Sequence, residues 1–217
     1  MVRKREDGFH DIESVFYPIP WCDILEIVPE NSGRGEMTFT SSGVEIPSNG
    51  GRNLCEQVYQ LMHEEFDLNS VKIHLHKLVP IGAGLGGGSA DAAFTAVMLN
   101  DIFELGCSSE KLEDIVSKVG SDCPFFIENK PAYVTGRGEI LEPFDLDLSG
   151  YWIVLVNPNI HIGTKEAYSG ITPAEPHSYL KELLSKDVSE WNNGVKNDFE
   201  ASIFPSHPEI EKLKVQL

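Results

Sequence analysis

The stretch Pro80-Ile-Gly-Ala-Gly-Leu-Gly-Gly-Gly-Ser-Ala-Asp-Ala-Ala93 decides the fold, because it places five glycines within the seven positions 82–88, directly before an alanine-rich run. The preceding residues, Val71-Lys-Ile-His-Leu-His-Lys-Leu78, alternate apolar with polar side chains and predict a strand. Backbone N–H groups without a neighbouring Cβ can close around phosphate oxygens, and a following helix directs the positive end of its dipole to the same point. The order strand, glycine loop, helix therefore predicts a nucleotide-phosphate site.

Three other interpretations of this loop are weaker. A Walker A loop requires a lysine directly after its last glycine, and Gly88 occupies that position in the spacing set by Gly82 and Gly87. A Rossmann fingerprint is formally matched by Gly82, Gly84 and Gly87, but the acidic residues about 20 positions further on follow a helix rather than a strand. A flexible linker is the third interpretation, although linkers seldom separate an alternating strand from an alanine-rich helix. The Rossmann and linker interpretations stay open on these residues alone.

Composition limits the kinds of partner. Among the 217 residues, 34 are acidic and 17 basic, which gives a formal charge of −17. A nucleic-acid surface needs clustered Lys and Arg, so no nucleic-acid partner is expected, and a phosphate site must rely on backbone dipoles and a metal ion. Four separated cysteines without a C-x-x-C pair indicate reduced thiols and a cytoplasmic location. No apolar run approaches the roughly 20 residues that span a bilayer, so no membrane partner is expected.

The pattern along the chain predicts an α+β protein with two domains. A connection at 143–150 separates an N-terminal nucleotide-binding domain, 1–145, from a C-terminal substrate domain, 146–217. Apolar periodicity and turn residues predict a turn at 31–35, helices at 53–66 and 107–119, a hairpin at 132–141, a buried strand at 151–156 and a helix from 209.

The glycine loop resembles that of the GHMP kinases (galactokinase, homoserine kinase, mevalonate kinase and relatives), which follows the pattern Pro-x-x-x-Gly-Leu-Gly-Ser-Ser-Ala-Ala. Pro80, Gly84, Leu85 and Gly86 match this pattern, whereas glycines replace its two serines and Ser89 follows one place later. The triple glycine followed by serine is similar to the branch of the family that phosphorylates 4-diphosphocytidyl-2-C-methyl-D-erythritol.

Three further segments support that branch. Its cytidine-pocket segment, Arg-x-Asp-Gly-Tyr/Phe-His, is matched by Arg5-Glu-Asp-Gly-Phe-His10. Its catalytic-aspartate segment is matched by Gly120-Ser-Asp-Cys-Pro-Phe-Phe126. The segment that crosses back over the base is matched by Asn157-Pro-Asn-Ile-His-Ile-Gly-Thr-Lys-Glu-Ala-Tyr168. Four motifs in the right order cover nearly the whole chain.

The resemblance implies a GHMP kinase-like two-domain fold, with an N-terminal domain like domain 2 of ribosomal protein S5 and a partial ferredoxin-like C-terminal domain. It implies transfer of the ATP γ-phosphate, with Mg²⁺, to the 2-hydroxyl of this small-molecule substrate in isoprenoid precursor biosynthesis. Two alternatives stay open: another GHMP kinase acting on a sugar or amino-acid alcohol, and a truncated nucleotide-binding module without turnover. The oligomeric state and the metal ligands are not indicated.

The resemblance also implies roles for individual residues. Asp122 takes the proton from the substrate hydroxyl, and the competing explanation is a turn or N-cap aspartate. Asn53 lies near the adenine unless it only caps a helix, and Lys77 lies near the nucleotide unless it is a solvated strand residue. His10 hydrogen-bonds the cytosine unless it is a surface histidine after the Asp7-Gly8 turn. The neighbouring aromatic residues stack on the cytosine unless they only pack a core. The residues expected to bind ATP are Pro80, Ile81, Gly82, Ala83, Gly84, Leu85, Gly86, Gly87, Gly88, Ser89, Ala90, Asn53 and Lys77, and those expected to bind substrate are Phe9, His10, Phe16, Thr164 and Tyr168.

Two segments of the family pattern are absent from the sequence. An N-terminal Ala-Lys-x-Asn-Leu segment, with a lysine near the catalytic aspartate, is expected about a dozen residues before Val2. A glycine-rich Gly-Ser/Thr-Gly segment is expected after the helix that begins near Glu209. We therefore expect either a fragment or a truncated product whose turnover is reduced, because the lysine charge would favour an ionised Asp122.

Overall fold

The computed structural model describes residues 1–47, 51–174 and 180–217, with the backbone alone at 31–34 and 193. These residues form two compact units, Tyr17–Lys130 and a second unit made of Met1–Phe16 with Pro131–Leu217. The division differs from the predicted boundary after residue 145, because an N-terminal strand pairs with a strand that begins at Ala132. The mixture of helices and sheets agrees with the predicted α+β class.

The unit Tyr17–Lys130 is built on a three-stranded sheet. Its strands are β4 (Ile24–Arg34), β5 (Met37–Gly43) and β6 (Asn69–Lys77), in the order β4-β6-β5. The central strand β6 is antiparallel to β4 and parallel to β5. The predicted turn at 31–35 is wrong in extent, because β4 continues to Arg34 and the chain leaves the strand only at Gly35, which has a φ of +73°.

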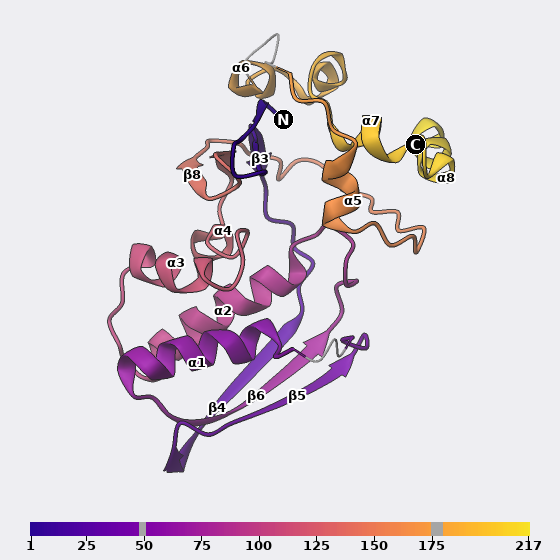
Figure 1. The fold of residues 1–217 in the computed structure, drawn as a ribbon. Coiled ribbons are helices and arrows are strands. Elements are labelled where there is room, and N and C mark those ends of the chain that lie inside the picture. Colours follow the sequence, from indigo (N-terminus) through magenta and orange to yellow (C-terminus); the bar gives the residue numbers. More distant parts are fainter. Residues whose placement is uncertain (48–50, 175–179) are drawn as a thin grey trace. The chain divides into compact units, whose positions relative to one another are not determined.

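Helices cover one face of this sheet (Figure 1). The helices next to the sheet are α1 (Leu54–Phe66) and α2 (Gly87–Ile102), and α3 (Ser109–Ser117) and α4 (Phe125–Glu128) pack against α2. The core lies between sheet and helices because β6 turns alternate residues inward, where they meet the apolar side of α1 and α2. Its buried members include Val58, Tyr59, Met62, Val71, Ile73, Leu75, Ala92, Ala96, Leu99, Ile115 and Val116.

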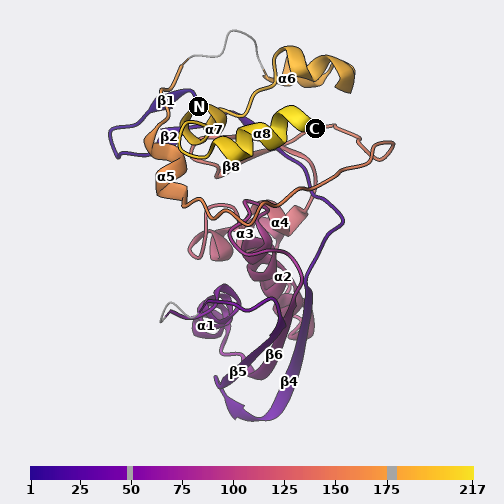
Figure 2. The ribbon, with the colours of Figure 1, turned by 90° about the vertical axis from the view of Figure 1, so that its right-hand side faces the viewer.

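The second unit contains two small sheets. One pairs β1 (Arg3–Lys4) with β2 (His10–Asp11), and the other has the order β3-β7-β8, from β3 (Ser14–Phe16), β7 (Ala132–Thr135) and β8 (Ile140–Pro143). The predicted hairpin is confirmed as the antiparallel pair β7–β8, with Gly136 and Gly138 at positive φ in its turn. The helices are α5 (Thr164–Ser169), α6 (Leu180–Leu184), the 3₁₀ helix η1 (Val188–Asn193), α7 (Phe199–Ile203) and α8 (Pro208–Gln216) (Figure 2).

The predicted buried strand at 151–156 is wrong. Its six residues form no strand, and their side chains are exposed, with Trp152 at 99 % of its full accessibility. A strand needs a neighbour for its backbone hydrogen bonds, and among the described strands none pairs with this segment. Apolar composition alone therefore could not fix its conformation.

Within the described ranges, no helix is long and apolar enough to cross a membrane.

Candidate active site

The glycine loop joins the end of β6 to the start of α2, as the sequence predicts. Gly82, Gly84 and Gly86 have φ values of +72°, +72° and +69°, in the left-handed region that residues with a Cβ rarely adopt. Gly86 is the N-cap residue of α2, and no side chain caps this helix. The amide groups of the first turn are thus free to meet an anion, and the helix dipole favours negative charge at the same place.

Close packing fixes the path of the loop. A Cβ built on Gly86 would lie 2.8 Å from the ζ carbon of Phe126, in α4. A Cβ on Gly87 would lie 3.1 Å from the Nζ atom of Lys77. Glycine at these two positions therefore serves packing within the protein as well as any approach of phosphate.

The segment that carries Asp122 contacts the loop on both sides of the aspartate. Before it, a Cβ on Gly120 would come within 3.0 Å of the Sγ atom of Cys123 and 4.0 Å of the hydroxyl of Ser89. After it, Phe126 packs on Gly86. The Asp122 carboxylate is exposed and accepts a hydrogen bond from the Ser121 hydroxyl at 3.1 Å. The unit thus presents an exposed carboxylate on a segment anchored to the phosphate loop.

Ser89 has a partner within the protein. Its hydroxyl hydrogen-bonds the thiol of the buried Cys123, whose pKa is raised by burial and lowered in part by this hydrogen bond. The expected contact of Ser89 with ATP stays a prediction.

A buried ion cluster lies beneath the loop. Lys77 is 4 % exposed, and its ammonium pairs with Asp23 and, at 2.7 Å, with Asp91. Burial raises the pKa of Asp91 to about 6, against the opposing effect of Lys77. Burial also acts to raise the pKa of Asp23, but hydrogen bonds from Lys77 and two backbone N–H groups outweigh it and lower that pKa. The explanation of Lys77 as a solvated strand residue is therefore wrong.

Asn53 caps α1. Its side-chain oxygen accepts a hydrogen bond from the N–H of Cys55 at 2.9 Å, and Glu56 reaches back to the N–H of Asn53 at 2.7 Å. This capping box explains why the helix begins at Leu54. Its expected contact with adenine stays a prediction.

The second unit brings two predicted substrate residues together. The ring centroids of His10 and Tyr168 lie 5.4 Å apart with an interplanar angle of 33°. The ring of Phe199, in α7, meets Tyr168 edge-on at 5.0 Å. His10 is 9 % exposed and Tyr168 is half-buried. Residues from three distant parts of the sequence therefore form one aromatic cluster.

The other predicted substrate residues are more dispersed. Thr164 is exposed at the first turn of α5, one turn before Tyr168. Phe9 is 56 % exposed, and the guanidinium of Arg137 lies 5.0 Å from the centroid of its ring. Phe16 is half-buried in β3, where its backbone pairs with Ala132.

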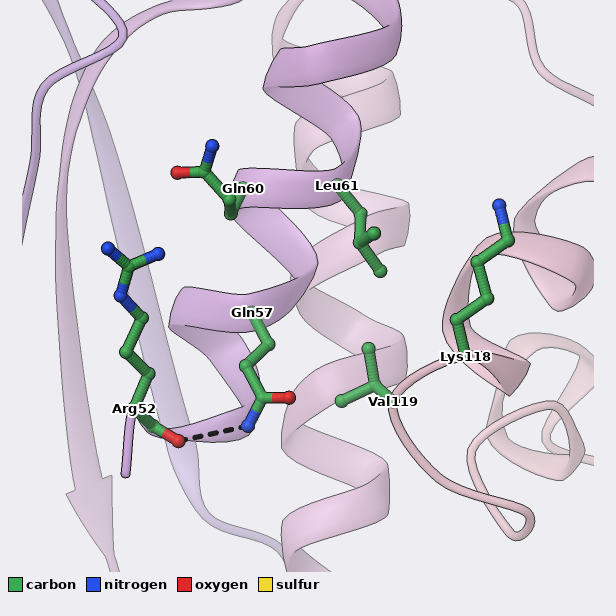
Figure 3. A pocket seen from close by; sticks show the side chains of 6 residues that line it. All are labelled: Arg52, Gln57, Gln60, Leu61, Lys118 and Val119. Atoms are coloured by element: carbon green, nitrogen blue, oxygen red, sulfur yellow. Dashed lines mark hydrogen bonds between the residues drawn. The ribbon is translucent and has the colours of Figure 1, made fainter. Parts of the chain in front are cut away.

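A pocket of about 230 Å³ lies beside α1 and is lined by none of the predicted site residues (Figure 3). Leu61 and Val119 point toward one another, and the Nε2 atom of Gln57 donates to the carbonyl of Arg52 at 3.0 Å. The six lining residues are Arg52, Gln57, Gln60, Leu61, Lys118 and Val119.

Sequence reasoning missed Asp23, Asp91 and Phe126. One signal was available for the two aspartates. In the alternating strand, Lys77 has the same parity as Val71 and Ile73, which face the core, so a buried lysine in need of carboxylate partners was predictable. Phe126 ends the matched segment that carries Asp122, but no sequence signal indicated its contact with Gly86, which depends on the packing of α4.

Comparisons with known proteins agree with this architecture. A family model, the GHMP kinases N terminal domain, matches residues 53–130, from the N-cap residue of α1 to just beyond the end of α4. A 4-diphosphocytidyl-2-C-methyl-D-erythritol kinase of Cytophaga hutchinsonii is 49 % identical over 100 % of this chain and 79 % of its own length. The kinase of the same name from Bacteroides fragilis is 47 % identical over the same shares.

A solved structure also matches. The crystal structure of a 4-(cytidine 5'-diphospho)-2C-methyl-D-erythritol kinase superposes with a TM-score of 0.77 at 26 % identity, covering 97 % of this chain and 74 % of that one. The chain therefore belongs to the GHMP kinases, and among them to the family of 4-diphosphocytidyl-2-C-methyl-D-erythritol kinases.

Proposed function

We propose that this kinase transfers the γ-phosphate of ATP to the 2-hydroxyl of 4-diphosphocytidyl-2-C-methyl-D-erythritol, in isoprenoid precursor biosynthesis. The observation that carries the proposal is the N-terminus of α2, which no side chain caps and which follows a loop with three glycines at positive φ. This loop packs against the segment that bears Asp122. The chain is also 49 % identical to a kinase named for this substrate.

The loop supplies the phosphate site. Backbone amides of residues 82–89 and the dipole of α2 stabilise the negative charge of the triphosphate, as at other helix N-termini that bind anions. Such preorganised donors matter most in phosphoryl transfer, where catalysis consists largely of positioning and charge stabilisation. The chain's formal charge of −17 makes these local dipoles the main attraction for an anionic nucleotide.

Asp122 acts as the general base. Its carboxylate is exposed, so a substrate hydroxyl can reach it, and its segment is anchored to the loop at Gly86 and Ser89. Removing the hydroxyl proton as the oxygen attacks the γ-phosphorus yields the phosphate ester and ADP.

The residues present are compatible with Mg²⁺. The described residues hold no group of three His, Cys, Asp or Glu side chains that could cage a metal. Magnesium usually keeps several waters and binds through one or two carboxylates together with substrate phosphates, so an all-protein cage is not required. The ion would neutralise phosphate charge beside the exposed carboxylate of Asp122.

The cytidine group is bound by the aromatic cluster. His10 hydrogen-bonds the cytosine edge and Tyr168 offers a ring for stacking, while Thr164 lies one turn earlier on the same helix. Edge-on packing of Phe199 restricts the ring of Tyr168, which reduces the entropy cost of stacking.

Substrate specificity is tested first by binding and then by phosphoryl transfer. Tyr168→Ala should weaken cytidine-diphosphate binding by roughly 1–3 kcal/mol, the scale for one base–aromatic stack, and leave ATP binding unchanged. Tyr151→Ala is the matched control, because Tyr151 belongs to the same unit, is 55 % exposed and lies outside the cluster. Phosphoryl transfer from labelled ATP to the cytidine compound, galactose and homoserine is then compared. Preferred transfer to either of the last two would refute the substrate assignment in favour of another GHMP kinase activity.

A further inference from the structure

A buried cation lies under the phosphate loop and connects the elements on both of its sides. Lys77 is the last residue of β6, and its side chain is only 5 % accessible. Its ammonium pairs with Asp23, which precedes β4, and with the Oδ2 atom of Asp91 in α2, at 2.7 Å. The three side chains are each less than 9 % accessible. Buried charges of this kind are tolerated only when they are paired and hydrogen-bonded.

Asp23 holds the first residues of the loop. Its second oxygen, Oδ1, accepts hydrogen bonds from the N–H groups of Leu78 at 2.6 Å and Val79 at 2.8 Å. These residues lie between the end of β6 and Pro80, so one carboxylate is bonded both to the ammonium and to the entry of the loop.

Asp91 holds the exit of the loop. It lies in α2, little more than one turn beyond the N-cap residue Gly86, and its side chain reaches back to Lys77. A Cβ on Gly87 would be 3.1 Å from the Nζ atom of Lys77, so the backbone of the first helical residue rests directly against the ammonium. The cluster therefore fixes the start of α2 relative to the end of β6.

We propose that Lys77, Asp23 and Asp91 are positioning residues, which hold the two ends of the loop so that its amide groups face the phosphates before nucleotide arrives. The proposal rests on the proposed function, since it concerns the same ATP site. Two carboxylates surround one ammonium, so Lys77 has little charge to offer a phosphate, and attraction comes from the positioned amides. Donors that need no rearrangement on binding contribute more affinity.

A positioning role and a direct contact between Lys77 and nucleotide predict opposite changes in ATP affinity when Asp91 is replaced. Removing the carboxylate of Asp91 leaves the ammonium paired with Asp23 alone. If Lys77 bound phosphate directly, Asp91→Ala would free it and ATP would bind as well or more tightly. If the cluster positions the loop, the same substitution lets the start of α2 move and ATP binds more weakly.

The experiment compares ATP with adenosine, which has no phosphates. Dissociation constants for the full chain and its variants are measured by calorimetry for ATP with Mg²⁺ and by ligand-observed NMR for adenosine. For Asp91→Ala and Lys77→Met we expect the ATP constant to rise about tenfold, the scale of one charge-assisted hydrogen bond, and the adenosine constant to change less than twofold. Asp91→Asn keeps an oxygen for the ammonium and should recover most of the ATP affinity.

Thr95→Val is the matched control, because Thr95 is fully buried one turn further along α2. Its hydroxyl hydrogen-bonds the carbonyl of Asp91, at 2.7 Å, and the thiol of Cys55, rather than a charged side chain of the cluster. Thr95→Val should lower the melting temperature without changing the ratio of the ATP and adenosine dissociation constants. An unchanged ratio in a folded Asp91→Ala would overturn the positioning role. If Lys77→Met does not fold, Asp91→Ala and Asp91→Asn still decide the question. Absence of ATP binding by the wild type would instead refute the proposed function.

Discussion

Replacing Gly86 with alanine tests how far the phosphate loop depends on its contact with α4. Gly86 has a φ of +69°, and a Cβ there would lie 2.8 Å from the Phe126 ring. Gly84 is a matched control, because its φ is +72° and a Cβ would meet nothing within 4 Å. Both substitutions carry the same conformational strain, and only the one at Gly86 adds overlap.

The magnitudes follow from these two terms. A left-handed residue with a Cβ costs about 1–2 kcal/mol, and overpacking adds about 1–3 kcal/mol. Gly84→Ala should therefore lower the free energy of unfolding by about 1–2 kcal/mol and Gly86→Ala by about 2–5 kcal/mol. Because the Phe126 ring must move, the loop and the segment of Asp122 should separate, and ATP should bind more weakly.

Urea unfolding followed by circular dichroism, together with ATP titration, measures both effects. Phe126→Leu should partly restore stability in the Gly86→Ala background and not in the Gly84→Ala background, which would show as coupling in a double-mutant cycle. Equal destabilisation by the two glycine substitutions, with no coupling to Phe126, would refute the packing argument.

Two further predictions concern α1 and the buried cluster. Asn53→Ala should lower the free energy of unfolding by about 0.5–2 kcal/mol, because it removes the capping box; unchanged urea unfolding would contradict that role. Burial raises the pKa of Asp91 from 3.8 for the free side chain to about 6 in the folded state. Ionisation of Asp91 therefore lowers the free energy of unfolding as pH rises from about 4 to above 6. The free energy of unfolding of Asp91→Asn relative to wild type should thus increase by about 2–3 kcal/mol between pH 4 and pH 7, and a difference independent of pH would contradict the burial of an ionised Asp91.

The strongest local patterns in the sequence predicted the fold well. Glycine spacing and alternation located the loop between β6 and α2, and helical periodicity with Asn53 located α1, because these features depend on nearby residues. The strand prediction for residues 151–156 was wrong for the opposite reason. A strand depends on a partner elsewhere in the chain, and periodicity carries no information about that partner.

The site was predictable to the extent that it consists of continuous motifs. Two matching segments identified His10 and Tyr168 as candidate substrate residues. The spacing of these residues in the sequence did not show that their rings lie in contact. Asp23 lies 54 residues before Lys77 and Phe126 lies 40 residues after Gly86, so their contacts arise only when sheet and helices pack.

The central claim, that Asp122 is the base of an ATP-dependent kinase, is tested most directly by turnover of the Asp122→Asn variant. ATP-dependent phosphorylation of the cytidine-linked substrate is measured with this chain, and with the chain extended at both ends by the residues that flank the aligned region in the Cytophaga hutchinsonii kinase. Asp114→Asn is the control, because Asp114 is an exposed carboxylate on α3. In the extended protein, Asp122→Asn should lower turnover by roughly 10²–10⁴ while ATP and substrate still bind, since the amide cannot accept the proton. Near-full turnover in that variant would contradict the account.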